Sequence, residues 1–156
     1  KAREAQSEYE RNGSQARYDR AAAAVAWAIM KPERNRELAE MGTCLQIMRD
    51  ATERRSHRED ADFDFHLSIT TAANNQYFET SMRALREHIA VGMKFHGLSL
   101  QTVRGGLDHV LDEHASIFAA IANGEAERAR EAMRGHVTGS RDRLFEGRLL
   151  DLSSRG

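Results

Sequence analysis

The chain has 156 residues, which suits a single domain with a sizeable core. Its formal net charge of -1 argues against a nucleic-acid-binding surface on this chain, because DNA-binding domains usually carry a clear basic excess. A single cysteine excludes an internal disulfide and fits a reducing cytoplasm, where we expect the protein to be located. No apolar run reaches the roughly 18 residues of a membrane span, so we expect no membrane partner.

The sequence pattern predicts helices throughout. There is one proline, Pro32, and hardly any run of alternating β-branched residues, so strands are poorly supported. Apolar positions at helical spacing predict helices at 15–30, 33–56, 59–73, 75–96, 104–122 and 125–146. The predicted breaks between them are Pro32, Asn74-Asn75, Gly97, Gly105-Gly106 and Asn123-Gly124. We therefore predict an all-α fold, an antiparallel bundle of six or seven helices.

Four polar residues fall where core side chains are expected. His114 lies within the apolar stripe of its helix, and His136 lies within that of the last helix. Asp62 and His66 form an i, i+4 pair, so both side chains project from one helical face. One histidine on an apolar face is more often a hydrogen-bonded core residue, and Asp62 alone could be solvated within its acidic run.

The combination of these four residues is more informative than any one of them. A buried aspartate among three inward histidines needs either a dense hydrogen-bond network or a cation. Three imidazoles and one carboxylate suit a borderline metal such as zinc, nickel, manganese, cobalt or iron. The residue pattern thus leaves two interpretations open, a divalent-metal site and a buried polar network.

The remaining histidines are predicted to have ordinary structural roles. His57 lies in a polar, arginine-rich run that is typical of a solvated face. His88 and His96 flank the apolar stripe of the helix at 75–96, and His109 lies on the polar side of its helix.

Three segments together resemble a known family. Residues 62–69 with 72–75 resemble the pattern D-x-x-F-H-x-x-[IL] followed by A-x-x-N. Residues 113–124 resemble E-H-x-x-I-x-x-A-I-x-x-G, and residues 132–136 resemble A-M-x-x-H. The order and spacing are those of the FCD domain, the C-terminal effector-binding domain of the FadR subfamily of GntR-type bacterial transcription regulators.

The resemblance implies helices around a central ligand cavity with a metal on its floor. It assigns Asp62, His66, His114 and His136 as ligands of one divalent metal, with zinc favoured and nickel, manganese, iron or cobalt as alternatives. A small organic or sugar acid would complete the coordination through its carboxylate, and a homodimer is expected. The intact histidine set argues against the acyl-CoA-binding members of the family.

The sequence departs from the family pattern at the start of one helix and lacks the DNA-binding domain. Asn74-Asn75 replaces Gly-Asn, and Gln76 replaces a proline. No N-terminal winged helix-turn-helix is present, so operator DNA would be contacted only through a domain outside this chain. We expect a linker-like segment at 1–14, the FCD domain at 15–146 and a polar tail at 147–156.

Effector-binding arginines are predicted on two helices. Arg83 and Arg86 lie beside the apolar stripe of the helix at 75–96 and are candidates to face the cavity. Arg17 or Arg20 loosely matches an arginine that family members use. A solvated surface role is an equally weighted alternative for each. Asn75 is predicted to cap a helix rather than to bind effector.

Two other functions compete with effector sensing. A metalloenzyme of hydrolase type could use the same three histidines and aspartate to activate water. A purely structural bundle would use them as a buried network. We expect a sensor and no enzyme, because no HExxH or ExxH signature and no evident paired base or nucleophile accompanies the site.

Overall fold

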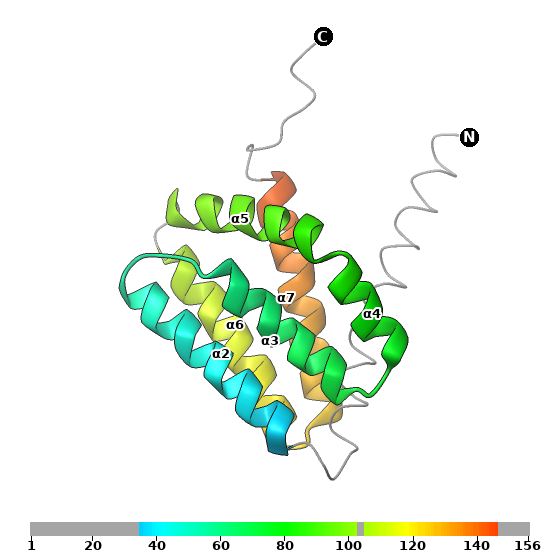
Figure 1. Cartoon of the computed structure of the whole chain (residues 1–156). Helices are drawn as coiled ribbons and strands as arrows, with labels where there is room; N and C mark the ends of the chain where they lie inside the picture. Colours follow the sequence, from blue (N-terminus) through cyan, green and yellow to red (C-terminus); the bar gives the residue numbers. More distant parts are fainter. Residues whose placement is uncertain (1–34, 103–104, 147–156) are drawn as a thin grey trace, which may run out of the picture.

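The structure, a computed structural model, describes residues 35–102 and 105–146 (Figure 1). These residues form six helices and no strand, which confirms the predicted all-α fold. The helices are α2 (Asn35–Glu53), α3 (Glu59–Ala72), α4 (Gln76–Ala84), α5 (Arg86–Thr102), α6 (Gly106–Ala122) and α7 (Ala126–Glu146). The predicted helix at 15–30 lies outside the described residues. No helix in the described ranges is long and apolar enough to span a bilayer.

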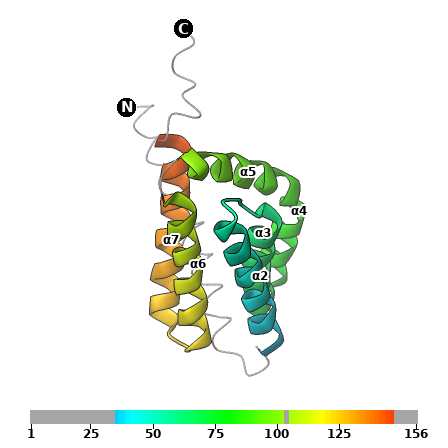
Figure 2. The ribbon, with the colours of Figure 1, turned by 90° about the vertical axis from the view of Figure 1, so that its left-hand side faces the viewer.

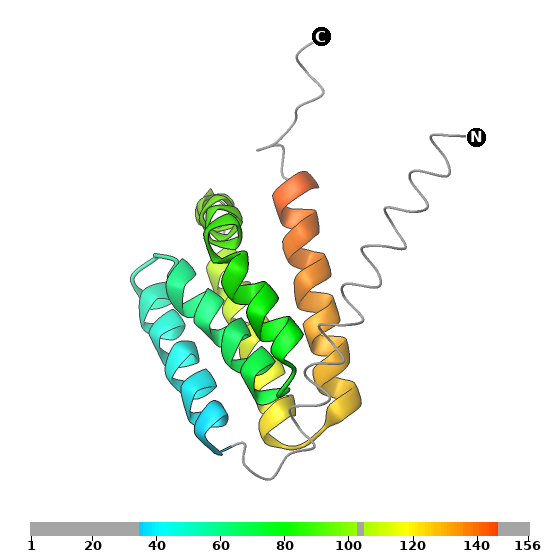
Figure 3. The same cartoon turned by 45° about the vertical axis from the view of Figure 1, so that its right-hand side comes forward.

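The helices form a bundle that is crossed at one end. α2 packs on α3, α6 packs on α7, and α2 also contacts α6 (Figure 1). α5 runs across the end of this bundle and contacts α3, α6 and α7 (Figure 2). α4 lies beside α3 (Figure 3). The bundle therefore holds α3, α6 and α7 around a shared interior, with α5 over one end of it.

The core follows from the helical spacing of apolar residues. The buried cluster comprises Met41, Leu45, Met48, Ala61, Phe65, Ile69, Ala72, Ile117, Ala120, Ile121, Ala129 and Met133. Burying each larger side chain contributes roughly 1.5–3 kcal/mol before conformational entropy is considered. This cluster contains side chains of both α3 and α6. Polar side chains on the inward faces of these two helices therefore face each other inside the bundle.

Two predicted helix breaks are confirmed. Asn74 adopts a positive φ of 50°, and the Asn75 side chain accepts a hydrogen bond from the Tyr77 amide, so Asn75 caps α4. Gly124 adopts a φ of 73° between α6 and α7. Both turns use residue types that tolerate the left-handed region.

The predicted helix at 75–96 is wrong in both its continuity and its end. The chain breaks at Leu85, which separates α4 from α5, and α5 then continues through Gly97. Gly97 is needed for close packing rather than for a turn, because a Cβ there would lie 2.8 Å from Nδ1 of His57. A glycine in sequence does not distinguish these two uses.

Candidate metal centre

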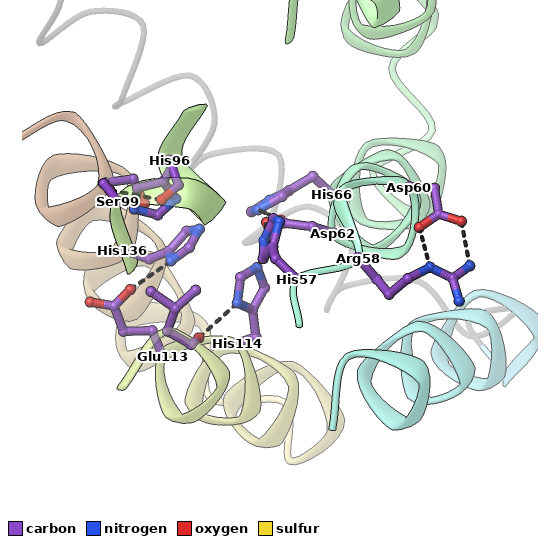
Figure 4. A network of polar contacts seen from close by, with 12 residues as sticks. His57, Arg58, Asp60, Asp62, His66, His96, Ser99, Glu113, His114 and His136 are labelled. Atoms are coloured by element: carbon purple, nitrogen blue, oxygen red, sulfur yellow. Dashed lines mark hydrogen bonds and ion pairs between the residues drawn. The ribbon is translucent and has the colours of Figure 1, made fainter. Parts of the chain in front are cut away.

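Three histidines from three helices converge inside the bundle (Figure 4). His66 comes from α3, His114 from α6 and His136 from α7, and one nitrogen of each lies within 4.8 Å of those of the other two. The ring centroids of His114 and His136 are 4.3 Å apart. The structure thus brings together the three histidines that the sequence singled out.

Asp62 completes this cluster from α3. Its Oδ1 lies 3.1 Å from Nε2 of His114 and 3.4 Å from Nε2 of His66. Its Oδ2 lies 3.1 Å from Nε2 of His57. Burial alone would raise the pKa of Asp62, but the hydrogen bonds from His114, His57 and His66 hold it well below the usual range. The buried group is therefore a carboxylate anion.

Outer hydrogen bonds orient two of the imidazoles. Nδ1 of His114 donates to the carbonyl of Val110 at 2.8 Å. Nδ1 of His136 lies 2.9 Å from the Glu113 carboxylate, which can only accept. Each ring consequently keeps Nε2 as its remaining ligand atom, which is the arrangement that metal-binding histidines use.

The donor set fits a divalent cation. Both nitrogens of His114 face oxygen acceptors, the Val110 carbonyl and the Asp62 carboxylate. Burial lowers the pKa of His114, but the interaction with Asp62 outweighs it and raises the pKa. Nε2 of His114 therefore faces a carboxylate that favours positive charge at this position, and a metal cation can supply that charge in place of a proton. Three imidazoles and a carboxylate are suitable ligands for zinc and its neighbours.

A second polar network supports the centre from α5 and α7. Arg143 donates to both oxygens of Glu113, at 3.0 and 2.8 Å, and to Nε2 of His96 at 3.2 Å. Burial would raise the pKa of Glu113, but hydrogen bonds from His136 and Arg143 lower it to about 2. Burial and the Arg143 charge lower the pKa of His96 to about 4. His96 is therefore neutral, and its Nδ1 carries the proton.

A cavity of about 500 Å³ opens beside the centre. Asp62, His66 and His136 line it at the metal-centre end. Its other lining residues are Ile69, Thr70, Met82, Ile89, Gly92, Met93, His96, Met133, Val137, Ser140 and Arg141. A ligand in this cavity can reach the histidine cluster.

The structure places two of the four predicted arginines, Arg83 and Arg86, away from this cavity. Arg83 pairs with Glu79 at 2.8 Å, and Arg86 pairs with Asp64 at 3.0 Å; both arginines are exposed, and neither lines the cavity. Arg17 and Arg20 lie outside the described residues. Among the described residues, the arginine that lines the cavity is Arg141, which the sequence interpretation missed.

The prediction for His57 was wrong. The His57 side chain is 11% exposed rather than solvated, because the loop after α2 turns it back onto Asp62. His96 is buried and lines the cavity. Its helical spacing from Met93 was a usable signal, whereas nothing local marked His57. His88 and His109 are exposed, as expected.

Replacing Gly97 with alanine is expected to destabilise the chain by about 1–3 kcal/mol and to weaken zinc binding roughly tenfold. The new methyl group would meet the His57 ring at 2.8–3.0 Å and push it from Asp62. Urea unfolding and a zinc competition titration measure the two effects.

Gly92→Ala is the matched control on α5. A Cβ at Gly92 meets nothing within 4 Å, so this variant is expected to be neutral or slightly stabilising. If Gly97→Ala and Gly92→Ala had the same stability and the same zinc affinity, the contact between residue 97 and His57 would not matter for either property.

Comparison with known proteins gives the family. The FCD domain model matches residues 15–139, which is most of the chain. The chain is also 29% identical over 87 residues to the HTH-type transcriptional regulator LutR of Bacillus subtilis (strain 168). That match covers 55% of this chain and 40% of the regulator, so the chain matches less than half of its relative's length. The chain belongs to the FCD domain family.

Proposed function

We propose that this chain is the effector-sensing domain of a GntR-type transcription regulator of the FadR subfamily. The observation that carries the proposal is the convergence of His66, His114 and His136 beside a cavity large enough for a ligand. The family match and the regulator relative support sensing over catalysis. A purely structural role for the cluster would leave the adjoining cavity without a purpose.

The proposed centre holds one divalent metal on His66, His114, His136 and Asp62, with zinc favoured. The bound metal would supply a Lewis acid that attracts the carboxylate of an organic acid. Val110 fixes the orientation of the His114 ring, and Glu113 fixes that of the His136 ring. The bundle excludes bulk water from His114, which is 0% exposed.

Signal transmission follows from where these residues are located. The proposed ligands come from α3, α6 and α7, and α5 lines the same cavity. An effector that binds one arrangement of these helices more tightly than another shifts their populations. In the longer protein we propose that this shift reaches a DNA-binding domain and changes operator affinity. A homodimer and a cytoplasmic location are further parts of the proposal.

Zinc should stabilise the purified chain, and a carboxylate added to the zinc-loaded chain should stabilise it further. We expect zinc to raise the melting temperature of the EDTA-treated chain, and at least one acid from a carboxylate panel to raise it further. The same acid without zinc should have little effect, which makes the metal-free sample the internal control. Absence of zinc binding would contradict the metal centre, and metal binding without any acid effect would contradict sensing through it.

A further inference from the structure

The cavity beside the metal centre is larger than a very small acid requires. Its volume is about 500 Å³. A cavity of about 150 Å³ accommodates benzene, which has six non-hydrogen atoms. The cavity therefore has room for a ligand of roughly 10–20 non-hydrogen atoms.

The lining away from the metal centre is mainly apolar. Its apolar side chains are those of Ile69, Met82, Ile89, Met93, Met133 and Val137. Methionine side chains are flexible and polarisable, so they adapt to apolar groups of different shape. Hydroxyl groups placed against them would lose their hydrogen bonds to water without replacement.

The polar side chains of the cavity belong to its metal-centre end or follow it by one helical turn: Thr70 lies one turn after His66 on α3, and Ser140 and Arg141 lie one turn after His136 on α7. Asp62, His66 and His136 form that end, and His96 is held neutral beside it by Arg143. A ligand that matches this distribution has its charge at one end and an apolar body at the other.

We propose that the effector is a monocarboxylic acid with an apolar body, aromatic or medium-chain aliphatic, and not a polyhydroxylated acid. This inference rests on the proposed function, because the carboxylate meets the metal centre. The body lies against the methionines and isoleucines of α3, α4, α5 and α7. Recognition thus combines one charged anchor with burial of apolar surface.

A ligand series on the zinc-loaded chain tests the proposal by calorimetric titration. Phenylbutyrate and octanoate represent the proposed class. Gluconate matches phenylbutyrate closely in number of non-hydrogen atoms but is polyhydroxylated, and acetate carries the anchor alone. Phenylbutyramide keeps the apolar body and lacks the charge. We expect phenylbutyrate or octanoate to bind at least about tenfold more tightly than gluconate, acetate or phenylbutyramide.

Variants on α5 locate the binding site of the apolar body. Ile89→Asn places an amide in the cavity lining and is expected to weaken phenylbutyrate binding about tenfold while zinc affinity is unchanged. Val91→Asn is the matched control, because Val91 is 57% exposed and does not line the cavity.

The outcomes separate this inference from the proposed function. Tighter binding of gluconate or acetate than of phenylbutyrate and octanoate would overturn the apolar class and leave metal-dependent sensing supported. Equal binding of phenylbutyramide and phenylbutyrate would overturn the carboxylate anchor. Failure of zinc to bind would overturn the proposed function itself.

Discussion

Replacing His114 with alanine is expected to lower zinc affinity about a hundredfold and to destabilise the metal-free chain by about 2–4 kcal/mol. The imidazole is 0% exposed, so its removal leaves a cavity in the interior. Its removal also leaves the buried Asp62 carboxylate without the hydrogen bond that it accepts from Nε2 of His114. The binding free energy of zinc at a four-ligand site is about 10–16 kcal/mol. The loss of one ligand therefore costs roughly 3 kcal/mol, which corresponds to about a hundredfold in affinity.

A control at an exposed position distinguishes ligand loss from a general effect of losing a histidine. His88 is exposed on α5, and His88→Ala is expected to change stability by less than about 0.5 kcal/mol. His66→Ala removes a less buried ligand, so it should weaken zinc binding with a smaller loss of stability. Unchanged zinc affinity in both His114→Ala and His66→Ala would place the metal elsewhere or exclude it.

The stability of the metal-free chain is expected to fall by several kcal/mol between pH 7 and pH 4. Burial, reinforced by the charge of His114, lowers the pKa of His136 from 6.5 to about 3. Burial and the Arg143 charge lower that of His96 to about 4. The unfolded chain takes up these protons at a higher pH than the folded chain does, so stability is lost as the pH falls below about 6.5.

Two other groups adjust this profile. The raised pKa of His114 acts in the opposite direction, because its contribution is present below pH 6.5 and is lost as the pH rises through the folded value. Glu113, with a pKa of about 2 against the usual 4.5, adds a further loss below about pH 4.5. Two histidines oppose one, so the net stability decreases on acidification.

Urea unfolding in EDTA at several pH values measures this dependence. His96→Asn removes one titrating group and should flatten the profile between pH 6.5 and pH 4. His88→Asn alters an exposed residue and should leave the profile unchanged. A metal-free chain that is equally stable at pH 4 and pH 7 would contradict the predicted burial of neutral histidines.

The sequence predicted most of the helices and the inward positions of the histidines because both depend on local spacing. The family resemblance, and not the spacing, implied that the histidines share one site. His114 and His136 stood out since each interrupts an apolar stripe, and the stripes face inward in the fold. Asp62 and His66 followed from the i, i+4 relation within α3. These features need no knowledge of how distant segments approach one another.

The features that the sequence did not predict depend on contacts between distant segments. His57 lies in a loop whose path is set by how α2 packs on α3, and Gly97 meets it from α5. Arg86 faces away from the cavity because Asp64 and the Phe63 ring hold it on the surface. The position of an arginine beside an apolar stripe does not show which acidic or aromatic side chain it will contact in the fold.

Because α5 crosses the end of the bundle, substitutions on α5 affect the effector cavity and not the proposed metal ligands. α5 contributes Ile89 and Met93 to the cavity but none of the proposed metal ligands. Under the proposed function, a substitution of Ile89 or Met93 would therefore change which acid is recognised without removing a metal ligand. Gly97 and His96 are exceptions on α5. Gly97 packs against His57, which pairs with Asp62, and His96 accepts a hydrogen bond from Arg143, which also holds Glu113.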